Sequence, residues 1–186
     1  MTDKEFQDIL EPIVGQFIWG ARQLTGSFLT LEFGKPTIEF GRVHQPSEKN
    51  RFPFNKFERR RVRIKGEYSL FISMSNWKIY ADKTELAYDE SERNEIKLAL
   101  QFINGQKLSS ITLNTEENLT ELKFDLGGKI VISGEWYTDD LNEMWSFYTG
   151  TNKVLTYRND KKISYEKAGM EYGKEKFTEI KEKNLP

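Results

Sequence analysis

The chain has 186 residues, of which 31% are charged and 13% aromatic, and its 28 Lys and Arg residues nearly balance 29 Asp and Glu residues. So many aromatic residues at a net charge of -1 exclude an intrinsically disordered chain. The absence of cysteine excludes a disulfide framework, a thiolate zinc site and a cysteine nucleophile. The first residues lack the basic and apolar segments of a signal peptide, and no run reaches the roughly 18 apolar residues of a membrane span. We therefore expect a cytoplasmic protein without membrane contact.

Two helices are predicted from apolar residues at helical spacing. The first covers residues 2–14 and begins with a capping box formed by Thr2 and Glu5. The second covers residues 89–104 and has an apolar stripe along one face. The charged tail, residues 169–186, is expected to form a marginal surface helix.

Apolar and polar residues alternate at the period of a strand through most of the remaining chain. Hairpins are predicted at residues 29–40, 70–79 and 122–132. Further strands are predicted at residues 145–148, 154–157 and 163–165. About eight to ten strands follow from this pattern. The fold class is therefore α+β, mainly antiparallel sheet with two covering helices.

The two halves of the chain resemble each other in pattern. At an offset of 90, the first helix aligns with the second, and Gly15 aligns with Gly105. The pattern favours an internal duplication of a helix-plus-four-strand unit, as residues 2–83 and 89–167. Chance similarity between recurring secondary structures is the alternative. Because one such unit would leave its apolar sheet face open, we expect a single domain over residues 1–186.

The most unusual segment is residues 42–63, which contains eight basic and two acidic residues and has a net charge of +6. Binding residues are commonly found on a long insertion between two strands, because the sheet holds the insertion and the core does not need it. Arginine and phenylalanine side chains on this loop suit an acidic protein surface, or nucleic-acid bases and phosphates. The residues expected to bind a partner are Arg51, Phe54, Lys56, Arg59, Arg60 and Arg61.

A structural interpretation of the same segment is also open. Residues 59–63 could be the solvated start of a strand whose Val62 and Ile64 point inward, with the phenylalanines of the loop holding it against the body of the protein. A sequence pI near 6.0 also lacks the domain-wide basic footprint of a nucleic-acid-binding protein. We therefore favour an acidic protein partner over nucleic acid.

Two groups are candidates for catalysis. His44 is the only histidine, and no serine or aspartate can be assigned to it from the sequence. Glu135, Asp139, Asp140 and Glu143 form an acidic cluster without the ligand spacing of a calcium loop. A small-molecule enzyme using either group is the third hypothesis, and no metal or cofactor is expected.

Four short segments carry a resemblance: GSFLTLEFG at residues 26–34, GEYSL at 66–70, NWKI at 76–79 and NGQKL at 104–108. With them the chain resembles a group of small uncharacterised bacterial proteins, some of which are thought of as immunity-type proteins of toxin systems. The resemblance covers about residues 15–165 and rests on hairpin and helix-stop signals, so it carries over no catalytic residue. It implies a cytosolic protein that binds and blocks a toxin, with residues 42–63 as the contact.

The sequence therefore predicts a non-enzymatic, cytosolic binding protein of the immunity kind that contacts a protein partner through a basic, aromatic-containing loop. A nucleic-acid-binding module using the same loop is the alternative. Exposed sheet edges could pair in a homodimer, and the oligomeric state is left open.

Overall fold

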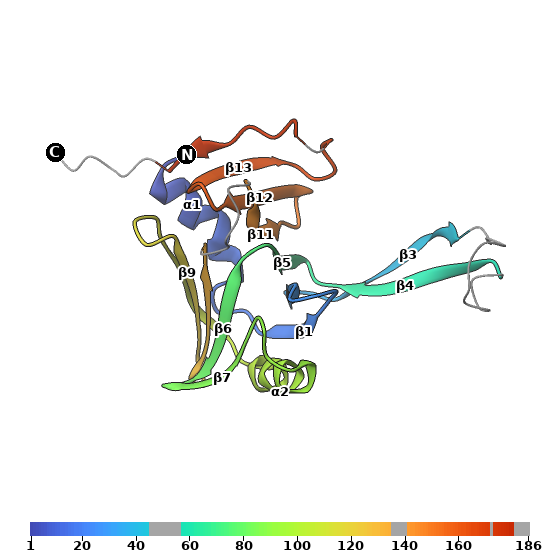
Figure 1. The fold of residues 1–186 in the computed structure, drawn as a ribbon. Helices are drawn as coiled ribbons and strands as arrows, with labels where there is room; N and C mark the ends of the chain where they lie inside the picture. The colour runs from blue at the N-terminus through green and yellow to red at the C-terminus, as the bar shows by residue number, and fades with distance from the viewer. Residues whose placement is uncertain (45–56, 135–140, 172, 181–186) are drawn as a thin grey trace.

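The computed structural model describes residues 1–44, 57–134, 141–171 and 173–180, which form two antiparallel sheets, two α-helices and a two-stranded arm (Figure 1). The predicted class, mainly antiparallel sheet with two helices, is confirmed at this level. Fourteen strands lie within the described residues, so the predicted eight to ten were too few. Among the helices of these segments, none has the length and apolar character needed to cross a membrane.

The larger sheet has seven strands in the order β1-β2-β5-β11-β12-β13-β14. They are β1 (Ile18–Gln23), β2 (Leu29–Phe33), β5 (Tyr68–Ile72), β11 (Glu143–Tyr148), β12 (Lys153–Arg158), β13 (Lys162–Lys167) and β14 (Thr178–Glu179). The smaller sheet has the order β7-β6-β10-β9-β8. Its strands are β6 (Asn76–Ala81), β7 (Thr84–Tyr88), β8 (Leu108–Asn114), β9 (Leu119–Phe124) and β10 (Gly128–Ser133). The remaining pair is β3 (Thr37–His44) with β4 (Arg59–Lys65).

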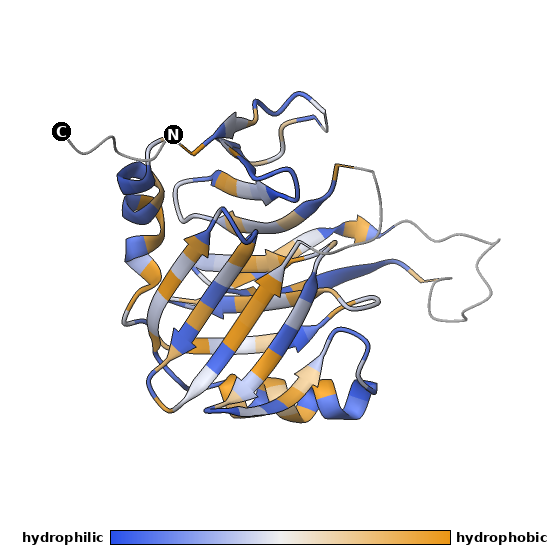
Figure 2. Ribbon diagram, turned by 60° about the vertical axis from the view of Figure 1, so that its left-hand side comes forward, coloured by the Kyte–Doolittle hydropathy of each residue, from blue (hydrophilic) through white to orange (hydrophobic). Residues whose placement is uncertain are grey.

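The two sheets share a hydrophobic core. Along β10 the side chains alternate, so that Ile130 and Ile132 are buried while their neighbours are partly exposed. The same alternation is visible as stripes along the strands in Figure 2. Trp145 of β11 is fully buried, and its Nε1 donates a hydrogen bond of 2.9 Å to Thr120 Oγ1 of β9. This bond links the two sheets through the core.

The helices cover this core. α1 (Asp3–Leu10) begins with the predicted capping box, because the Thr2 hydroxyl accepts from the Glu5 backbone at 3.2 Å and the Glu5 carboxylate accepts from the Thr2 backbone at 2.8 Å. The ring of its Phe6 packs against the ring of Trp145, with the two ring centroids 6.2 Å apart. α2 (Arg93–Ile103) lies against β1 and β7, which are edge strands of different sheets (Figure 1).

Residues that follow the two helices are joined by a symmetrical pair of backbone hydrogen bonds. The Gly15 N–H donates to Leu108 O at 2.7 Å, and the Gly105 N–H donates to Ile18 O at 2.9 Å. The two bonds are related by the offset of 90 residues seen in the sequence. Strand pairing also crosses between the halves, because β5 pairs with β11 and β6 pairs with β10. Duplication as the origin of this arrangement stays a prediction.

Two of the three predicted hairpins are wrong, and the third is confirmed. β2 pairs with β1 and β5, and the strand that follows it, β3, pairs with β4 outside the larger sheet. β5 and β6 lie in different sheets and do not pair. β9 and β10 do pair, through a turn in which Gly127 has a φ of +83°. Alternation identifies a strand but says nothing about its partner, which explains the two errors.

The predicted tail helix is also wrong for the part of the tail that the structure describes. There β14 extends the larger sheet by pairing with β13, and residues 174–177 are irregular. The Phe177 ring lies 4.0 Å from the Arg158 guanidinium, and Ile180 packs against the core. Sheet pairing and these contacts stabilise the segment, whereas a short charged helix would have had little support.

Candidate functional site

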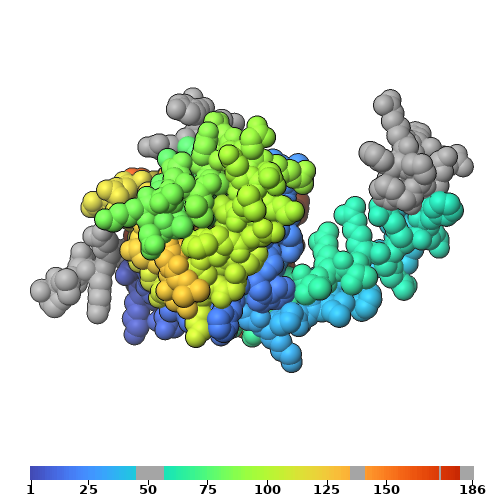
Figure 3. Space-filling model, turned by 90° about the horizontal axis from the view of Figure 1, so that it is seen from below, coloured from blue at the N-terminus to red at the C-terminus, as the bar shows by residue number. Residues whose placement is uncertain are grey.

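The candidate site is the arm, defined as β3 and β4. It continues the hairpin made by β2 and β5, whose pairing ends at Phe33 and Tyr68 and resumes in the arm at Thr37 and Lys65. Figure 1 shows the arm extending away from the two sheets, and Figure 3 shows it standing clear of the body in a space-filling view. Because β2 and β5 are interior strands of the larger sheet, the arm grows directly out of the core.

One face of the arm is apolar. In antiparallel pairing, residues opposite each other share a face, and here Ile38 pairs with Ile64 and Phe40 pairs with Val62. These four side chains are between 56% and 72% exposed. Val43, the next apolar residue of β3, is also exposed. A row of apolar side chains is thus in contact with solvent on both strands.

The opposite face of the arm is basic. Residues 59, 61, 63 and 65 of β4 point to this face, and all are Arg or Lys. The arm, residues 37–44 and 59–65, contains six Arg and Lys residues against one acidic residue, Glu39. Glu39 lies 3.9 Å from Lys65, and both side chains are about half exposed, so this ion pair contributes little. The arm is therefore an amphipathic β-ribbon.

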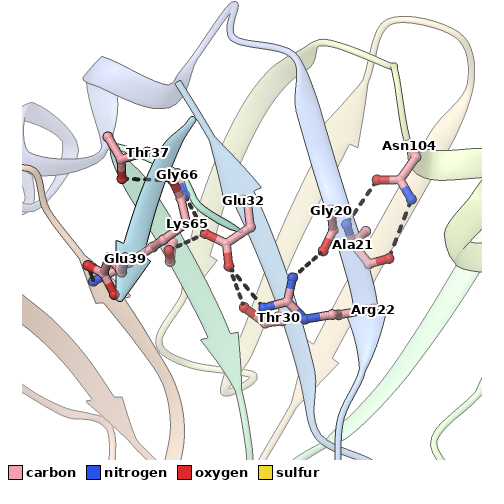
Figure 4. A network of polar contacts seen from close by, with 11 residues as sticks. Gly20, Ala21, Arg22, Thr30, Glu32, Thr37, Glu39, Lys65, Gly66 and Asn104 are labelled. Carbon is pink, nitrogen blue, oxygen red and sulfur yellow. Dashed lines mark hydrogen bonds and ion pairs between the residues drawn. The ribbon is translucent and has the colours of Figure 1, made fainter. Parts of the chain in front are cut away.

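The base of the arm is held by a buried carboxylate. Glu32 is only 3% exposed and accepts a hydrogen bond of 2.9 Å from the Gly66 backbone N–H (Figure 4). It also accepts a hydrogen bond from the Ser69 hydroxyl, and its other oxygen lies 3.5 Å from the Arg22 guanidinium. A buried carboxylate needs such partners. Together they connect β1, β2 and the start of β5 at the point where the arm leaves the sheet.

The same junction requires glycine at position 66. A Cβ atom there would lie 2.5 Å from the carbonyl oxygen of Phe33 and 2.7 Å from that of Tyr68. Both are backbone atoms that cannot move without breaking the pairing of β2 with β5. The close approach allows the two strands of the arm to leave the sheet side by side.

The structure separates the predicted binding residues into two groups. Arg59, Arg60 and Arg61 lie in β4, where Arg60 shares the apolar face and the other two point to the basic face. The other three, Arg51, Phe54 and Lys56, lie outside the described residues. The interpretation in which Val62 and Ile64 point inward is wrong, because both side chains are more than half exposed and none of the described parts of the body lies over this face of the arm.

His44 ends β3 opposite Arg59. Its Nε2 atom is buried and makes no hydrogen bond with any residue that the structure describes. Within the same residues, no serine or carboxylate is hydrogen-bonded to the ring, so the arrangement does not form a nucleophile–base pair.

The acidic cluster is placed only in part, since Glu135, Asp139 and Asp140 lie outside the described residues. Glu143 lies in β11, where burial and the negative charge of Glu175 raise the pKa of its carboxyl group. Among residues 1–44, 57–134, 141–171 and 173–180, no three His, Asp or Glu side chains gather as metal ligands. The structure therefore brings no catalytic set together in the part it describes.

Sequence reasoning missed a cleft of about 580 Å³ between β1 and α2. Three basic side chains line it, Arg22 from the strand and Arg93 and Lys97 from the helix. The spacing of Arg93, Lys97 and Gln101 on one helical face was a readable signal. The other wall of the cleft is β1, which was not among the predicted strands, so the cleft itself could not be predicted.

Comparison with protein-family models, curated proteins and solved structures found no match to the chain.

Proposed function

We propose that this chain is a non-enzymatic binding protein that docks onto a protein partner through the arm. The observation that carries the proposal is the exposed apolar face formed by Ile38, Phe40, Val62 and Ile64. A two-stranded ribbon is marginally stable in water by itself, and contiguous exposed apolar surface is typical of an interaction site. A partner that covers this face would remove it from water and stabilise the ribbon.

The basic face defines the chemistry of the partner. Arg61, Arg63 and Lys65 lie along one side of β4, next to the apolar face. Opposite charge at the rim of an interface increases the rate of association and selects the partner. The partner we propose is thus a protein with an apolar groove bordered by acidic residues. A toxin bound in the bacterial cytosol is the partner that the resemblance to immunity-type proteins implies.

The proposal is tested by recovering the partner with the tagged protein from native cell extract, with nuclease present, at low and moderate salt. The variant F40S/V62S removes two side chains of the apolar face, and L98S/L126S removes two exposed apolar side chains of the body as a matched control. We expect a stoichiometric protein partner whose affinity falls at least about tenfold in F40S/V62S and stays unchanged in the control. Equal recovery by both variants would contradict the proposal.

Nucleic-acid binding is the second candidate, favoured by the run of cations along the basic face. A two-stranded β-ribbon fits the major groove of DNA, and cations on one face can contact phosphates. If four cations contact phosphates, affinity should fall as salt is added, with a slope of about -3 to -4 in a plot of log binding constant against log salt concentration. In the same experiment without nuclease, recovery of nucleic acid that is weakened by R61E/R63E and unaffected by F40S/V62S would favour this candidate over the first.

A further inference from the structure

One edge of the smaller sheet is formed by β8, and its backbone is unpaired along most of the strand. At its start, Leu108 is hydrogen-bonded to Gly15 through its carbonyl oxygen and to Gln16 through its N–H, at 2.7 and 3.0 Å. Residues 110–114 pair with β9 on one side only, and on the other side they form no backbone hydrogen bond with any residue that the structure describes. Such a row of unpaired groups is a template for pairing with another strand.

The other edges of the two sheets are protected. On β1, the backbone of Ile18 is bonded to residues 105–106, and the Asn104 side chain bonds both backbone groups of Ala21 (Figure 4). α2 lies against β7, which also carries the charged Glu85. β14 is only two residues long. These are the usual means by which edge strands avoid pairing, and β8 shows none of them beyond residue 110.

The composition of β8 is that of an interior strand. Its sequence, Leu-Ser-Ser-Ile-Thr-Leu-Asn, contains no charged residue and no proline. Among the described strands, β5 is the only other one without a charge, and β5 is paired on both sides. The one irregularity of β8 is a register shift between Leu108 and Ser110, which leaves residues 110–114 in regular register with β9. Nothing along this stretch repels a second strand.

The core also reaches this edge. Ile111 is 4% exposed and lies opposite Leu122 of β9, and Leu113 packs against the core but is only partly buried. The two helices cover the core elsewhere, α2 against β1 and β7, and α1 through the contact of its Phe6 with Trp145. A strand added beside β8 would therefore cover the exposed part of Leu113.

We propose that β8 pairs antiparallel with β8 of a second copy of this chain, about a two-fold axis, so that the two smaller sheets become one continuous sheet. A second copy fits because the same uncharged strand then lies on both sides of a closed, symmetrical contact. In the register that uses all of residues 110–114, Thr112 lies opposite itself, Ile111 opposite Leu113 and Ser110 opposite Asn114. Opposite residues share a face in antiparallel pairing, so apolar side chains meet on the core side and polar side chains on the outer side. The contact does not include the arm and does not depend on the function proposed above.

The first test is sedimentation equilibrium of the full chain between about 1 µM and about 1 mM. We expect a dimer that dissociates at least about tenfold more readily in T112K, because two lysines would then lie opposite each other. T84K places the same charge at an exposed position of β7 and should leave the dimer unchanged, as should F40S/V62S, whose changes lie in the arm. A monomer throughout the range, equal dimerisation of T112K and wild type, or a dimer lost in F40S/V62S would each overturn the proposal.

The second test determines the register, and it is clean because the chain contains no cysteine. In T112C the two Cα atoms would be about 4.5–5.5 Å apart, a separation that a disulfide spans. We expect mild oxidation to convert T112C to a covalent dimer and to leave T84C, the matched control, monomeric under denaturing conditions. Failure of T112C to cross-link, or equal cross-linking of both variants, would overturn the proposed pairing. Because T112C adds no charge, this test also decides the matter if T112K does not fold.

Discussion

The carboxylate of Glu32 and the backbone N–H of Gly66, 34 positions apart in the chain, are joined by a hydrogen bond of 2.9 Å. The bond lies where β4 ends and β5 begins, so it joins the returning strand of the arm to an interior strand of the larger sheet. Direction and stability of the arm therefore depend on a side chain outside the arm.

Replacing Glu32 with Ala is expected to lower the free energy of unfolding by about 2–3 kcal/mol, because the Gly66 N–H and the Ser69 hydroxyl lose a charged, buried acceptor. Urea denaturation measures this change. Glu39→Ala is the matched control, since its carboxylate is exposed and 3.9 Å from Lys65, and it should cost less than about 1 kcal/mol. Equal losses in both variants would show that the junction does not depend on Glu32.

Replacing Gly66 with Ala is expected to cost at least about 2 kcal/mol, because the new methyl group would meet two backbone carbonyl oxygens at 2.5 and 2.7 Å. Gly41→Ala, within the arm, brings its Cβ no closer than 3.3 Å to a backbone atom and should cost less. Thermal unfolding of the two variants compares them. Hydrogen exchange of the arm amides should rise only in Gly66→Ala.

Replacing Thr120 with Val is expected to cost about 1–3 kcal/mol, because the buried Trp145 Nε1 loses its acceptor. The methyl group that replaces the hydroxyl nearly preserves the volume, so the loss reports the hydrogen bond between the two sheets. Denaturation followed by tryptophan fluorescence measures it. Thr112→Val, on the partly exposed side of β8, is a control that should be nearly neutral.

Stability is expected to fall between about pH 10 and pH 12 because of Tyr157. Burial, and then the charge of Asp160, raise the pKa of its phenol to about 12, whereas an unfolded tyrosine titrates near 10. Below pH 10 the phenol is protonated in the folded and the unfolded state, so its contribution to the free energy of unfolding is fully present. As pH rises toward 12 the unfolded state loses its proton first, and about 2–3 kcal/mol is lost. Unfolding free energies of the wild type and Tyr157→Phe across this range should differ in slope, and parallel curves would refute the assignment.

The apolar face of the arm should be nearly irrelevant to the stability of the free protein. We expect F40S/V62S to change the free energy of unfolding by less than about 0.5 kcal/mol, because both side chains are largely exposed. Leu70→Ala, in β5 of the larger sheet, should cost about 2–5 kcal/mol, because Leu70 is fully buried in the core. A large loss in F40S/V62S would mean that the arm packs against the body in solution.

The sequence contained enough information for the elements whose signals are local. The capping box of Thr2 and Glu5 and the hairpin at residues 122–132 each depend on residues a few positions apart, and both are confirmed. The partner of β2 depends on residues 68–72, which lie beyond the arm, and no local pattern identifies them. For the same reason the predicted hairpins at residues 29–40 and 70–79 failed.

The predicted binding segment, residues 42–63, overlaps the arm but differs from it in form. The excess of basic residues suggested a binding loop, whereas the described ends of this segment lie in the paired strands β3 and β4. Ile38 and Phe40 were placed in a predicted hairpin because they alternate with polar residues, and such alternation is usually a sign of one buried face. They are exposed because no second layer covers the arm within the part of the chain that the structure describes, and this arrangement can be seen only in the tertiary structure.

The exchange of strands between the halves has a consequence for synthesis of the chain. β6 pairs with β10, about 50 residues later, and β5 pairs with β11, about 75 residues later. A ribosome adds roughly 5–20 residues per second, so β5 and β6 are synthesised several seconds before the strands that pair with them. Pairings between strands so far apart in the sequence also slow folding itself, because the chain loses the entropy of closing a long loop before the contacts between the strands stabilise it. We therefore expect the core to close only after most of the second half has emerged from the ribosome.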